Sequence, residues 1–430
     1  MARTTAQSVT DAVALGASAL PEHGRPWPEI ERTLLACRLQ DPPPVEGAPE
    51  VYWPNVPDPA FHAAREAQAI YAHFNAFLVY CSPGFARIDQ ELRIAVAMLL
   101  GAPAGDHVTL TAGGTEGNFL AVKAAREWRR AHRPTTQPNM VLPITAHPSF
   151  DKAGHELGVE VRRVATTARW EADPAAMDDA IDDNTAIIVG SVPSYGHGTI
   201  DDIPALAELA AARDVWMHVD GAVGGFLAPH MREIDPSIPL SDLGVPGVRS
   251  MTADLHKYGF CLNGISTFTI AQAEDLHWPR FTVGPVWPVG GYTRNGFLGS
   301  RPGSVVAAAW ATFQALGRDG YRAIAAEIAA RQSHLADELA ALPGMTVVQP
   351  PRLGLFAAAP DDPVLVPLLL AGLAKRGWVI ADIAEPPALQ FLLSPAFDTG
   401  AFLAVFADVL DDVRSGRFST AGTAHTYGQD

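Results

Sequence analysis

A glycine-rich stretch is the first part of this sequence whose residue types suggest chemistry. Thr111–Asn118, TAGGTEGN, joins an expected strand at 107–110 to an expected helix at 117–130. Glycines in such a turn expose backbone N–H groups, and the N-terminus of the following helix attracts anions. The turn is therefore a candidate for binding a phosphate, although it can equally be a tight connection. It lacks the ending of a Walker loop and the GxGxxG spacing of a dinucleotide-binding turn.

Two further side chains stand at the ends of expected strands, where open α/β sheets bind their ligands. Asp220 ends the apolar run 215–219 and can hold a protonated ring nitrogen, or it can cap a helix or turn. Lys257 follows the expected strand 250–253 and is preceded by His256. A partly neutral lysine amine forms Schiff bases with carbonyls, whereas most lysines after a strand are surface charges. A phosphate turn, a carboxylate and an amine are together the groups that pyridoxal 5′-phosphate (PLP) requires.

The elements expected around these residues indicate the fold class. Short β-branched runs alternate with helical patterns, which predicts an α/β fold with a mostly parallel sheet covered by helices on both faces. The expected strands are 107–110, 140–144, 159–164, 186–189, 215–219, 250–253 and 265–270, and the expected helices are 88–100, 117–130, 150–157 and 203–212, with helical spacing also from Phe61 onward.

The C-terminal third of the chain is expected to form a smaller α/β region. Two helices, one ending at Leu316 and one over 321–342, lead into it. Strands and helices then alternate over 346–349, 364–375, 378–383, 389–393 and 401–413. We expect three parts: a Pro-rich N-terminal arm (1–60), a large ligand-binding domain (61–304), and a connecting helix with a small C-terminal domain (305–430).

Composition argues against several classes of function. The chain has 430 residues with 31 basic and 47 acidic side chains, and a net charge of −16 disfavours nucleic-acid binding. Cys37, Cys81 and Cys261 form no CxxC pair, so we expect neither a disulfide framework nor a cysteine-rich zinc site. Apolar runs end well before the about 18 residues of a membrane span, and no signal-peptide pattern begins the chain. We therefore expect a cytoplasmic protein without a membrane segment.

Five motifs follow one another in an order that points to a known family. They are GGTEGN (113–118), AHPSFDKAGHELG (146–158), HVDGAVGGF (218–226), SMTADLHKYGF (250–260) and GSRPG (299–303). Over roughly Asn75 to Tyr321 the chain resembles the fold-type-I PLP enzymes of the group II decarboxylase family, above all the sphingosine-1-phosphate lyase branch. The resemblance implies a PLP-dependent transferase-like large domain with a mostly parallel central sheet, a small C-terminal α/β domain and an N-terminal arm.

The resemblance also implies roles for individual residues. Lys257 would form the internal aldimine with PLP, and Asp220 would pair with the pyridine nitrogen and keep it protonated. His147 matches the family histidine that stacks on the ring, unless it is an ordinary loop histidine. His256 is expected beside the phosphate or as a proton-transfer group, since histidine titrates near working pH. The expected catalytic residues are thus Lys257, His147 and His256.

Other matches concern the phosphate and the partner subunit. Gly114 and Thr115 correspond to the phosphate-binding turn of the family, where Thr115 can donate through its N–H and its hydroxyl. Arg301 resembles the arginine of a loop that reaches the phosphate region of the neighbouring subunit. The resemblance therefore implies at least a homodimer, with active sites at the subunit interface.

Three residues near this set have two interpretations each. Asn118 either contacts the cofactor or caps a helix. Ser191 and His197 follow an expected strand and match a family loop close to the ring, but either can instead satisfy loop backbone groups. We include Ser191 among the expected cofactor contacts.

Departures from the family pattern bear on the substrate. The lyase branch has a second lysine six residues after the Schiff-base lysine, where this chain has Asn263, and a histidine where this chain has Leu78. Both changes remove groups suited to a phosphate monoester. Gly221 replaces a methyl-bearing residue and is expected to leave room against one ring face. Arg352 is a candidate for a substrate carboxylate, although a solvated loop arginine is the better interpretation.

The leading hypothesis is a PLP-dependent carbon–carbon lyase that decarboxylates an amino acid. Retro-aldol cleavage of a non-phosphorylated amino alcohol or β-hydroxy amino acid is the alternative, because the bond held perpendicular to the ring is the one that breaks. A second alternative is a non-catalytic protein that keeps the fold. A third is a zinc hydrolase that uses His218, Asp220 and His256, although no HExxH-type pairing accompanies these residues. We expect no metal.

Overall fold

The computed structural model describes residues 21–39 and 57–418. The chain divides into two compact units, Met1–Val45 and Glu46–Asp430. In the first unit the structure describes helix α2 (Trp27–Arg38), which has no buried residues. Most of the expected Pro-rich arm and the tail after Phe418 lie outside the described residues. None of the described helices is long and apolar enough to cross a membrane.

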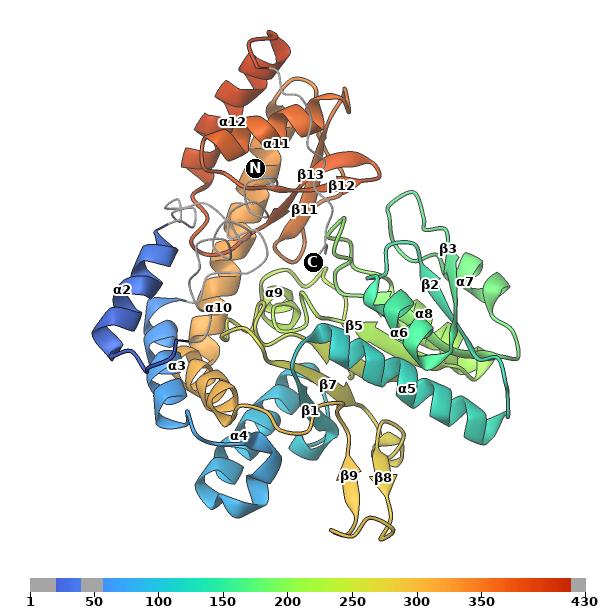
Figure 1. Cartoon of the computed structure of the whole chain (residues 1–430). Helices are drawn as coiled ribbons and strands as arrows, with labels where there is room; N and C mark the ends of the chain where they lie inside the picture. The colour runs from blue at the N-terminus through green and yellow to red at the C-terminus, as the bar shows by residue number, and fades with distance from the viewer. Residues whose placement is uncertain (1–20, 40–56, 419–430) are drawn as a thin grey trace. The chain divides into compact units, whose positions relative to one another are not determined.

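A seven-stranded sheet lies at the centre of the second unit, as far as the described residues show (Figure 1). Its strand order is β1-β7-β6-β5-β4-β2-β3, and the pairs from β6 to β3 are all parallel. Strand β7 runs antiparallel to β6 and β1. The strands are β1 (Val108–Thr111), β2 (Asn139–Pro143), β3 (Glu160–Val164), β4 (Thr185–Ser191), β5 (Trp216–Asp220), β6 (Val248–Ala253) and β7 (Ser266–Ile270). This confirms the predicted mostly parallel sheet.

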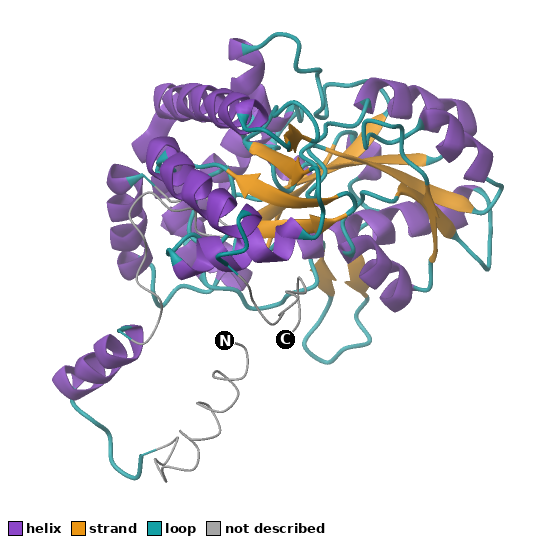
Figure 2. Cartoon of the chain, turned by 90° about the horizontal axis from the view of Figure 1, so that it is seen from above, coloured by secondary structure: helices purple, strands orange, loops and turns teal. Residues whose placement is uncertain are grey.

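Helices cover both faces of the sheet, as the view from above shows (Figure 2). In β4, Ile187 and Val189 pack in the core with α5 and α6, whereas Ile188 packs in the core with α8. Successive strand residues point to opposite faces, so a continuous apolar strand needs two helical layers. The helices up to this point are α3 (Asp58–Ile70), α4 (Pro83–Leu100), α5 (Gly114–His132), α6 (Ser149–Leu157), α7 (Pro174–Ala180), α8 (Ile203–Arg213) and α9 (Ala228–Ile234), with 3₁₀ helices η1 (Ala76–Cys81), η2 (Gly105–His107) and η3 (Ala273–Asp275).

The C-terminal part has its own antiparallel sheet, of order β10-β11-β13-β12, and its own apolar core around Trp378 and Phe402 (Figure 1). Helix α10 (Gly303–Ala341) leads into it and bends at Gly317, where the two predicted helices meet. Elements after α10 are β10 (Met345–Val347), β11 (Leu355–Pro360), α11 (Leu365–Lys375), β12 (Ala381–Ala384), β13 (Pro387–Leu392) and α12 (Thr399–Arg414). Strand β11 and the hairpin β8 (Phe281–Val283)–β9 (Tyr292–Arg294) were not predicted.

Gly198 marks a close approach between the large sheet's loops and β11. Its φ is +74°, and an added Cβ would lie 1.9 Å from the carbonyl oxygen of Leu355. We expect Gly198→Ala to lower the free energy of unfolding by about 3 kcal/mol or more, since a positive φ alone costs an L-residue roughly 1–2 kcal/mol and the backbone must also move apart. Urea unfolding midpoints measure the loss.

Gly158→Ala is the matched control for Gly198→Ala. Gly158 also has a positive φ, +64°, but an added Cβ would meet nothing within 4 Å. This control should therefore show only the conformational cost, roughly 1–2 kcal/mol. Equal losses in the two variants would contradict the close approach at Leu355.

Candidate active site

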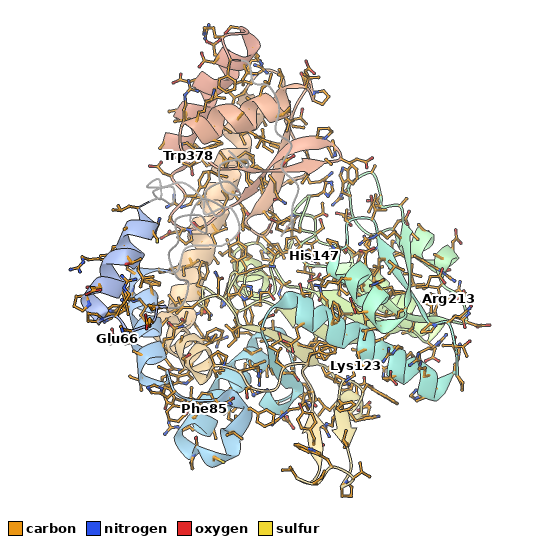
Figure 3. All side chains as sticks on the ribbon, viewed as in Figure 1. Glu66, Phe85, Lys123, His147, Arg213 and Trp378 are labelled. Atoms are coloured by element: carbon orange, nitrogen blue, oxygen red, sulfur yellow. The ribbon has the colours of Figure 1, made fainter. Side chains whose placement is uncertain are left out.

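The carboxyl ends of β1, β2, β4, β5 and β6 surround a cavity of about 180 Å³. Most of the predicted site residues line it: Gly114, Thr115, Asn118, His147, Ser191, Asp220, His256 and Lys257. Figure 3 marks His147 near the start of α6. Parallel strands bring residues that are far apart in the chain to one edge of the sheet.

The glycine-rich turn opens α5 at one wall of this cavity. Gly113 is extended and Gly114 begins the helix, so the first-turn N–H groups lack helical acceptors. A Cβ on Gly114 would lie 2.7 Å from Oδ1 of Asp254, so no larger residue fits without displacement. Glu116 accepts the N–H of Ala112 at 2.8 Å and holds the turn closed. This is the donor arrangement that a phosphate group needs.

Asp220 ends β5 and is 6% exposed. Its Oδ2 accepts from Asn118 at 3.1 Å, and its Oδ1 accepts from the N–H of Ala222 at 3.1 Å. Asn118 is buried and also donates to Ser149 at 2.9 Å. Asn118 does not cap α5; it lines the cavity and orients the carboxylate of Asp220, so a contact with the cofactor remains its expected role.

His218 lies one layer below Asp220 on the same face of β5. It is fully buried, with Nδ1 2.9 Å from the hydroxyl of Ser250, and burial lowers its pKa to about 3. The imidazole is therefore neutral and does not line the cavity. The zinc-hydrolase hypothesis required it to converge there with Asp220 and His256. Within residues 21–39 and 57–418 no group of three or more His, Cys, Asp and Glu side chains could hold a metal.

Lys257 follows β6, with its Nζ 2.9 Å from Oδ2 of Asp254. Asp254 is 2% exposed and accepts a hydrogen bond from Ser266 at 2.5 Å. Sequence reasoning missed Asp254. Its signal is an acidic residue directly after the strand and three positions before the lysine, which a turn brings together.

His256 and His147 present their rings from two sides of the cavity. The Nδ1 atom of His256 lies 2.7 Å from the carbonyl oxygen of Ile265 and therefore carries a proton. The Nδ1 atom of His147 accepts the N–H of Ser149 at 3.1 Å, which places its proton on Nε2. Burial lowers the pKa of both imidazoles. Nearby carboxylates raise these pKa values in part, whereas the charge of Lys257 lowers them further. Both are thus neutral near pH 7 in the protein alone.

Ser191 ends β4 and lines the cavity as expected, and the loop after it contributes Tyr195, which sequence reasoning missed. Tyr195 meets the ring of His147 edge-on, at 6.5 Å between centroids. The N–H of Ser191 donates to Asp201 at 2.6 Å, and burial raises the pKa of Asp201 to about 7. His197 does not line the cavity: its Nε2 is 2.7 Å from the carbonyl oxygen of Glu385. The structural interpretation of His197 therefore holds.

The remaining predicted residues lie elsewhere. Arg301 lines a different cavity, where its Nη1 donates to the carbonyl of Leu110 at 2.5 Å. Arg352 lines a third, with its Nη1 2.8 Å from the hydroxyl of Ser237, and is not placed to bind a substrate in the Lys257 cavity. Asn263 and Leu78 are exposed.

The expectation for Gly221 is wrong. An added Cβ would lie 2.4 Å from Cε of Met251 and 3.0 Å from the carbonyl oxygen of Thr252. The space that a methyl group would take is therefore filled by β6, and no extra room opens toward the cavity.

Sequence comparison extends the motif resemblance to most of the chain. The family model of the pyridoxal-dependent decarboxylase conserved domain matches residues 66–357. A sphingosine-1-phosphate lyase of Dictyostelium discoideum is 31% identical over 85% of this chain and 69% of its own length. A probable L-tyrosine/L-aspartate decarboxylase of Methanothermobacter thermautotrophicus is 31% identical over 75% of this chain and 90% of its own length.

Structural comparison agrees. A sphingosine-1-phosphate lyase structure from Burkholderia pseudomallei superposes with a TM-score of 0.85 and 29% identity, covering 94% of this chain and 95% of that one. The groups around the cavity are of the kinds that PLP requires: backbone amides at the start of α5, a buried carboxylate at Asp220 and an amine at Lys257. The chain therefore belongs to the pyridoxal-dependent decarboxylase family, a family of PLP-dependent lyases with the fold-type-I architecture.

Proposed function

We propose that this protein is an amino-acid decarboxylase that holds PLP through Lys257. The observation that supports this most is the convergence of Lys257, Asp220, His147 and the start of α5 on one cavity. When bound, PLP supplies an electron-withdrawing ring that weakens a bond at the substrate's Cα. The protein's task is to fix that ring, keep it protonated and decide which bond is aligned with it.

Asp220 and His147 act on the ring in this proposal. Asp220 offers a buried carboxylate whose orientation Asn118 sets, and it would hold a proton on the ring nitrogen. His147, neutral and held by Ser149, presents a flat face suited to stacking. Both roles need rigid placement, which their short contacts with neighbouring elements provide.

The phosphate would be bound by Gly114, Thr115 and His256. The backbone N–H groups of the α5 start and the hydroxyl of Thr115 are donors, and Ser191 lines the same cavity. His256 is neutral in the protein alone, but an adjacent anion would favour its charged form and make Nε2 a second donor. Phosphate binding and protonation of His256 would therefore be coupled.

Proton transfer would use Lys257 and Asp254. The carboxylate of Asp254, 2.9 Å from Nζ, stabilises a proton on the amine. Once substrate has replaced Lys257 on the cofactor, the amine is placed to receive a proton at Nζ and return it to the reacting carbon. Its mobility is limited by Asp254, so the proton is delivered to one side of the cavity.

Retro-aldol cleavage is the second candidate, favoured by the similarity to sphingosine-1-phosphate lyases. The side chains at Leu78 and Asn263 carry no charge, so we propose a non-phosphorylated amino alcohol or β-hydroxy amino acid for this route. Tyr195, with its ring beside His147, is a hydroxyl group that could exchange a proton with such a substrate.

We also propose a cytoplasmic homodimer with the domain division 1–60, 61–304 and 305–430. A second apolar core, which begins at Leu335 on α10, supports a separate C-terminal part, whereas the first half of α10 packs in the core of the central sheet. For the dimer, the loop before α10 that contains Arg301 would approach the partner's phosphate region, as the family resemblance suggests.

A product assay tests the proposed reaction. Purified holoenzyme is incubated with single amino acids, including tyrosine, aspartate and glutamate, and with β-hydroxy amines, while CO₂ and aldehyde are measured separately. We expect stoichiometric CO₂ and amine from at least one amino acid, with no aldehyde. Aldehyde without CO₂ would replace decarboxylation by the retro-aldol route, and neither product from a PLP-loaded protein would favour the non-catalytic hypothesis.

A further inference from the structure

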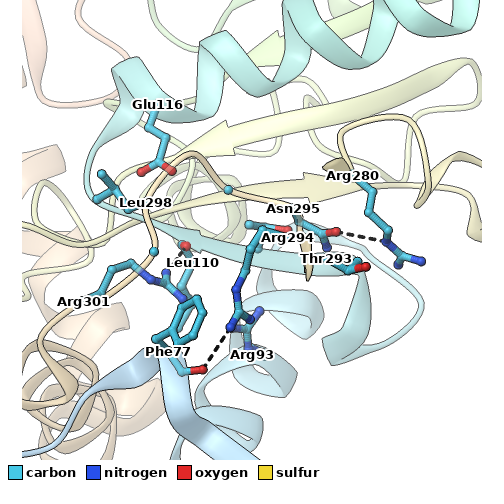
Figure 4. A pocket seen from close by; sticks show the side chains of 13 residues that line it. Phe77, Arg93, Leu110, Glu116, Arg280, Thr293, Arg294, Asn295, Leu298 and Arg301 are labelled. Atoms are coloured by element: carbon cyan, nitrogen blue, oxygen red, sulfur yellow. Dashed lines mark hydrogen bonds between the residues drawn. The ribbon is translucent and has the colours of Figure 1, made fainter. Parts of the chain in front are cut away.

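A second cavity, of about 260 Å³, adjoins the same β1–α5 turn as the Lys257 cavity (Figure 4). Leu110 and Glu116 line it from the two ends of that turn, whereas Gly113, Gly114 and Thr115 line the Lys257 cavity. The other notable feature of its lining is a set of four arginines: Arg93, Arg280, Arg294 and Arg301. These come from α4, from the two sides of the β8–β9 hairpin and from the segment before α10.

The positive charge in this cavity is only partly balanced. Arg93 pairs with Asp89, Nε to Oδ2, at 2.6 Å. Arg294 and Arg301 donate to backbone carbonyl oxygens, and among the described residues neither is within 4.0 Å of a carboxylate. Glu116 is the acidic residue of the lining, and its oxygens already accept the N–H groups of Ala112 and Phe297.

Two guanidinium donors in this set have no protein partner. The Nε atoms of Arg294 and Arg301 are buried and make no hydrogen bond to any described residue. Burial lowers the pKa of Arg301, repulsion by Arg93 and Arg294 lowers it further, and the carboxylates of Glu116 and Asp89 partly oppose this. Arg294 is meanwhile held in place, with its guanidinium carbon 3.7 Å from the ring centre of Phe77. Fixed, crowded guanidinium groups with spare N–H donors are suited to a multi-oxygen anion.

We propose that this arginine cavity binds the phosphate or carboxylate group of a small molecule, at a site separate from the Lys257 cavity of the same subunit and in addition to the partner's cofactor phosphate that the Arg301 loop would approach. The oxygens of the bound anion would accept hydrogen bonds from the unpartnered Nε–H groups of Arg294 and Arg301. The negative charge of the anion would offset the repulsion between Arg301 and Arg93. The anion would thereby join the β8–β9 hairpin to α4 and to the start of α10. This inference does not depend on which reaction occurs at Lys257.

The test uses holoenzyme reduced with borohydride, in which PLP is attached permanently and its phosphate occupies the cofactor site. Inorganic phosphate and succinate are titrated separately by calorimetry at low ionic strength. We expect one anion per subunit, with affinity that falls as salt is added. Tighter binding of phosphate would assign a phosphate-bearing ligand, and tighter binding of succinate a carboxylate-bearing one.

Arg294→Gln is the decisive variant and should weaken binding about tenfold or more, because it removes a charge-assisted donor. Arg280→Gln, at an exposed position of the same cavity, should weaken it less. Arg213→Gln is the matched control, since Arg213 on α8 pairs with Asp178 and lies outside the cavity lining. It should bind as the unchanged protein does.

Three results would overturn the proposal. One is the absence of saturable binding of either anion to the reduced holoenzyme. Another is equal binding by Arg294→Gln and Arg213→Gln; if Arg294→Gln does not fold, equal binding by Arg280→Gln and Arg213→Gln has the same meaning. The third is dissociation of subunits in Arg294→Gln without anion binding by the unchanged protein, which would assign the arginines to a contact with a second copy.

Discussion

Lys257→Ala is expected to yield a folded protein without the absorbance band near about 420 nm that PLP enzymes show when the cofactor is linked to lysine. The amine of Lys257 lies in the cavity with Asp220 and His147, and it is the group we propose to attach the cofactor. The unchanged protein should show the band, and borohydride should abolish it. Turnover should fall below detection in the variant, because both the attachment and the proton carrier are lost.

Lys152→Ala is the control for this experiment. Lys152 is an exposed lysine on α6 and does not line the cavity. Its band and turnover should match those of the unchanged protein. A Lys257→Ala variant that retained a borohydride-sensitive band would place the attachment at another lysine and remove the basis of the proposed mechanism.

Asp220→Asn is expected to reduce kcat by up to about 10³-fold at saturating PLP. Two unit charges about 4 Å apart interact by roughly 4 kcal/mol at an effective dielectric near 20, and each 1.36 kcal/mol is about tenfold in rate. Asparagine retains the shape and can still accept the N–H of Ala222, so the loss should reflect charge rather than folding. Steady-state rates are compared after cofactor occupancy has been measured in each variant.

Asp202→Asn is the control, because it tests whether the loss of another carboxylate would also lower kcat. Asp202 caps α8 by accepting the N–H of Ala205 at 3.1 Å, and asparagine caps almost equally well. Its kcat should be unchanged. A kcat for Asp220→Asn within tenfold of the unchanged protein would mean that Asp220 does not hold the charge on the ring nitrogen.

The sequence predicted the central sheet well because most of its strands are buried on both faces. Continuous apolar runs such as 186–189 are typical of such strands, and the structure confirms all of the predicted strands of the central sheet within a few residues. The same rule failed for β11. Half of its residues, Leu355–Pro360, are alanine and none is β-branched, so neither β-branching nor alternation marked it, although it is buried between β10 and β13.

Two site interpretations depended on contacts that no local pattern contains. Gly221 suggested space beside the ring, but the side chain of Met251 on the neighbouring strand fills that space. His197 matched a loop near the ring, yet its Nε2 contacts the carbonyl of Glu385, 188 residues later in the chain. Both outcomes were decided by residues brought close by folding.

By itself the sequence determined which chemical groups are present: a glycine-rich turn at Gly114, a carboxylate at Asp220, an amine at Lys257 and the order of their motifs. These features are local, because strand ends, glycine turns and motif spacing depend on neighbouring residues. The tertiary structure alone decided that Asn118 orients Asp220 and that four arginines from separate segments share a cavity. The physical reason is that pairing, burial and charge crowding depend on distances between elements, and those distances exist only once the sheet has formed.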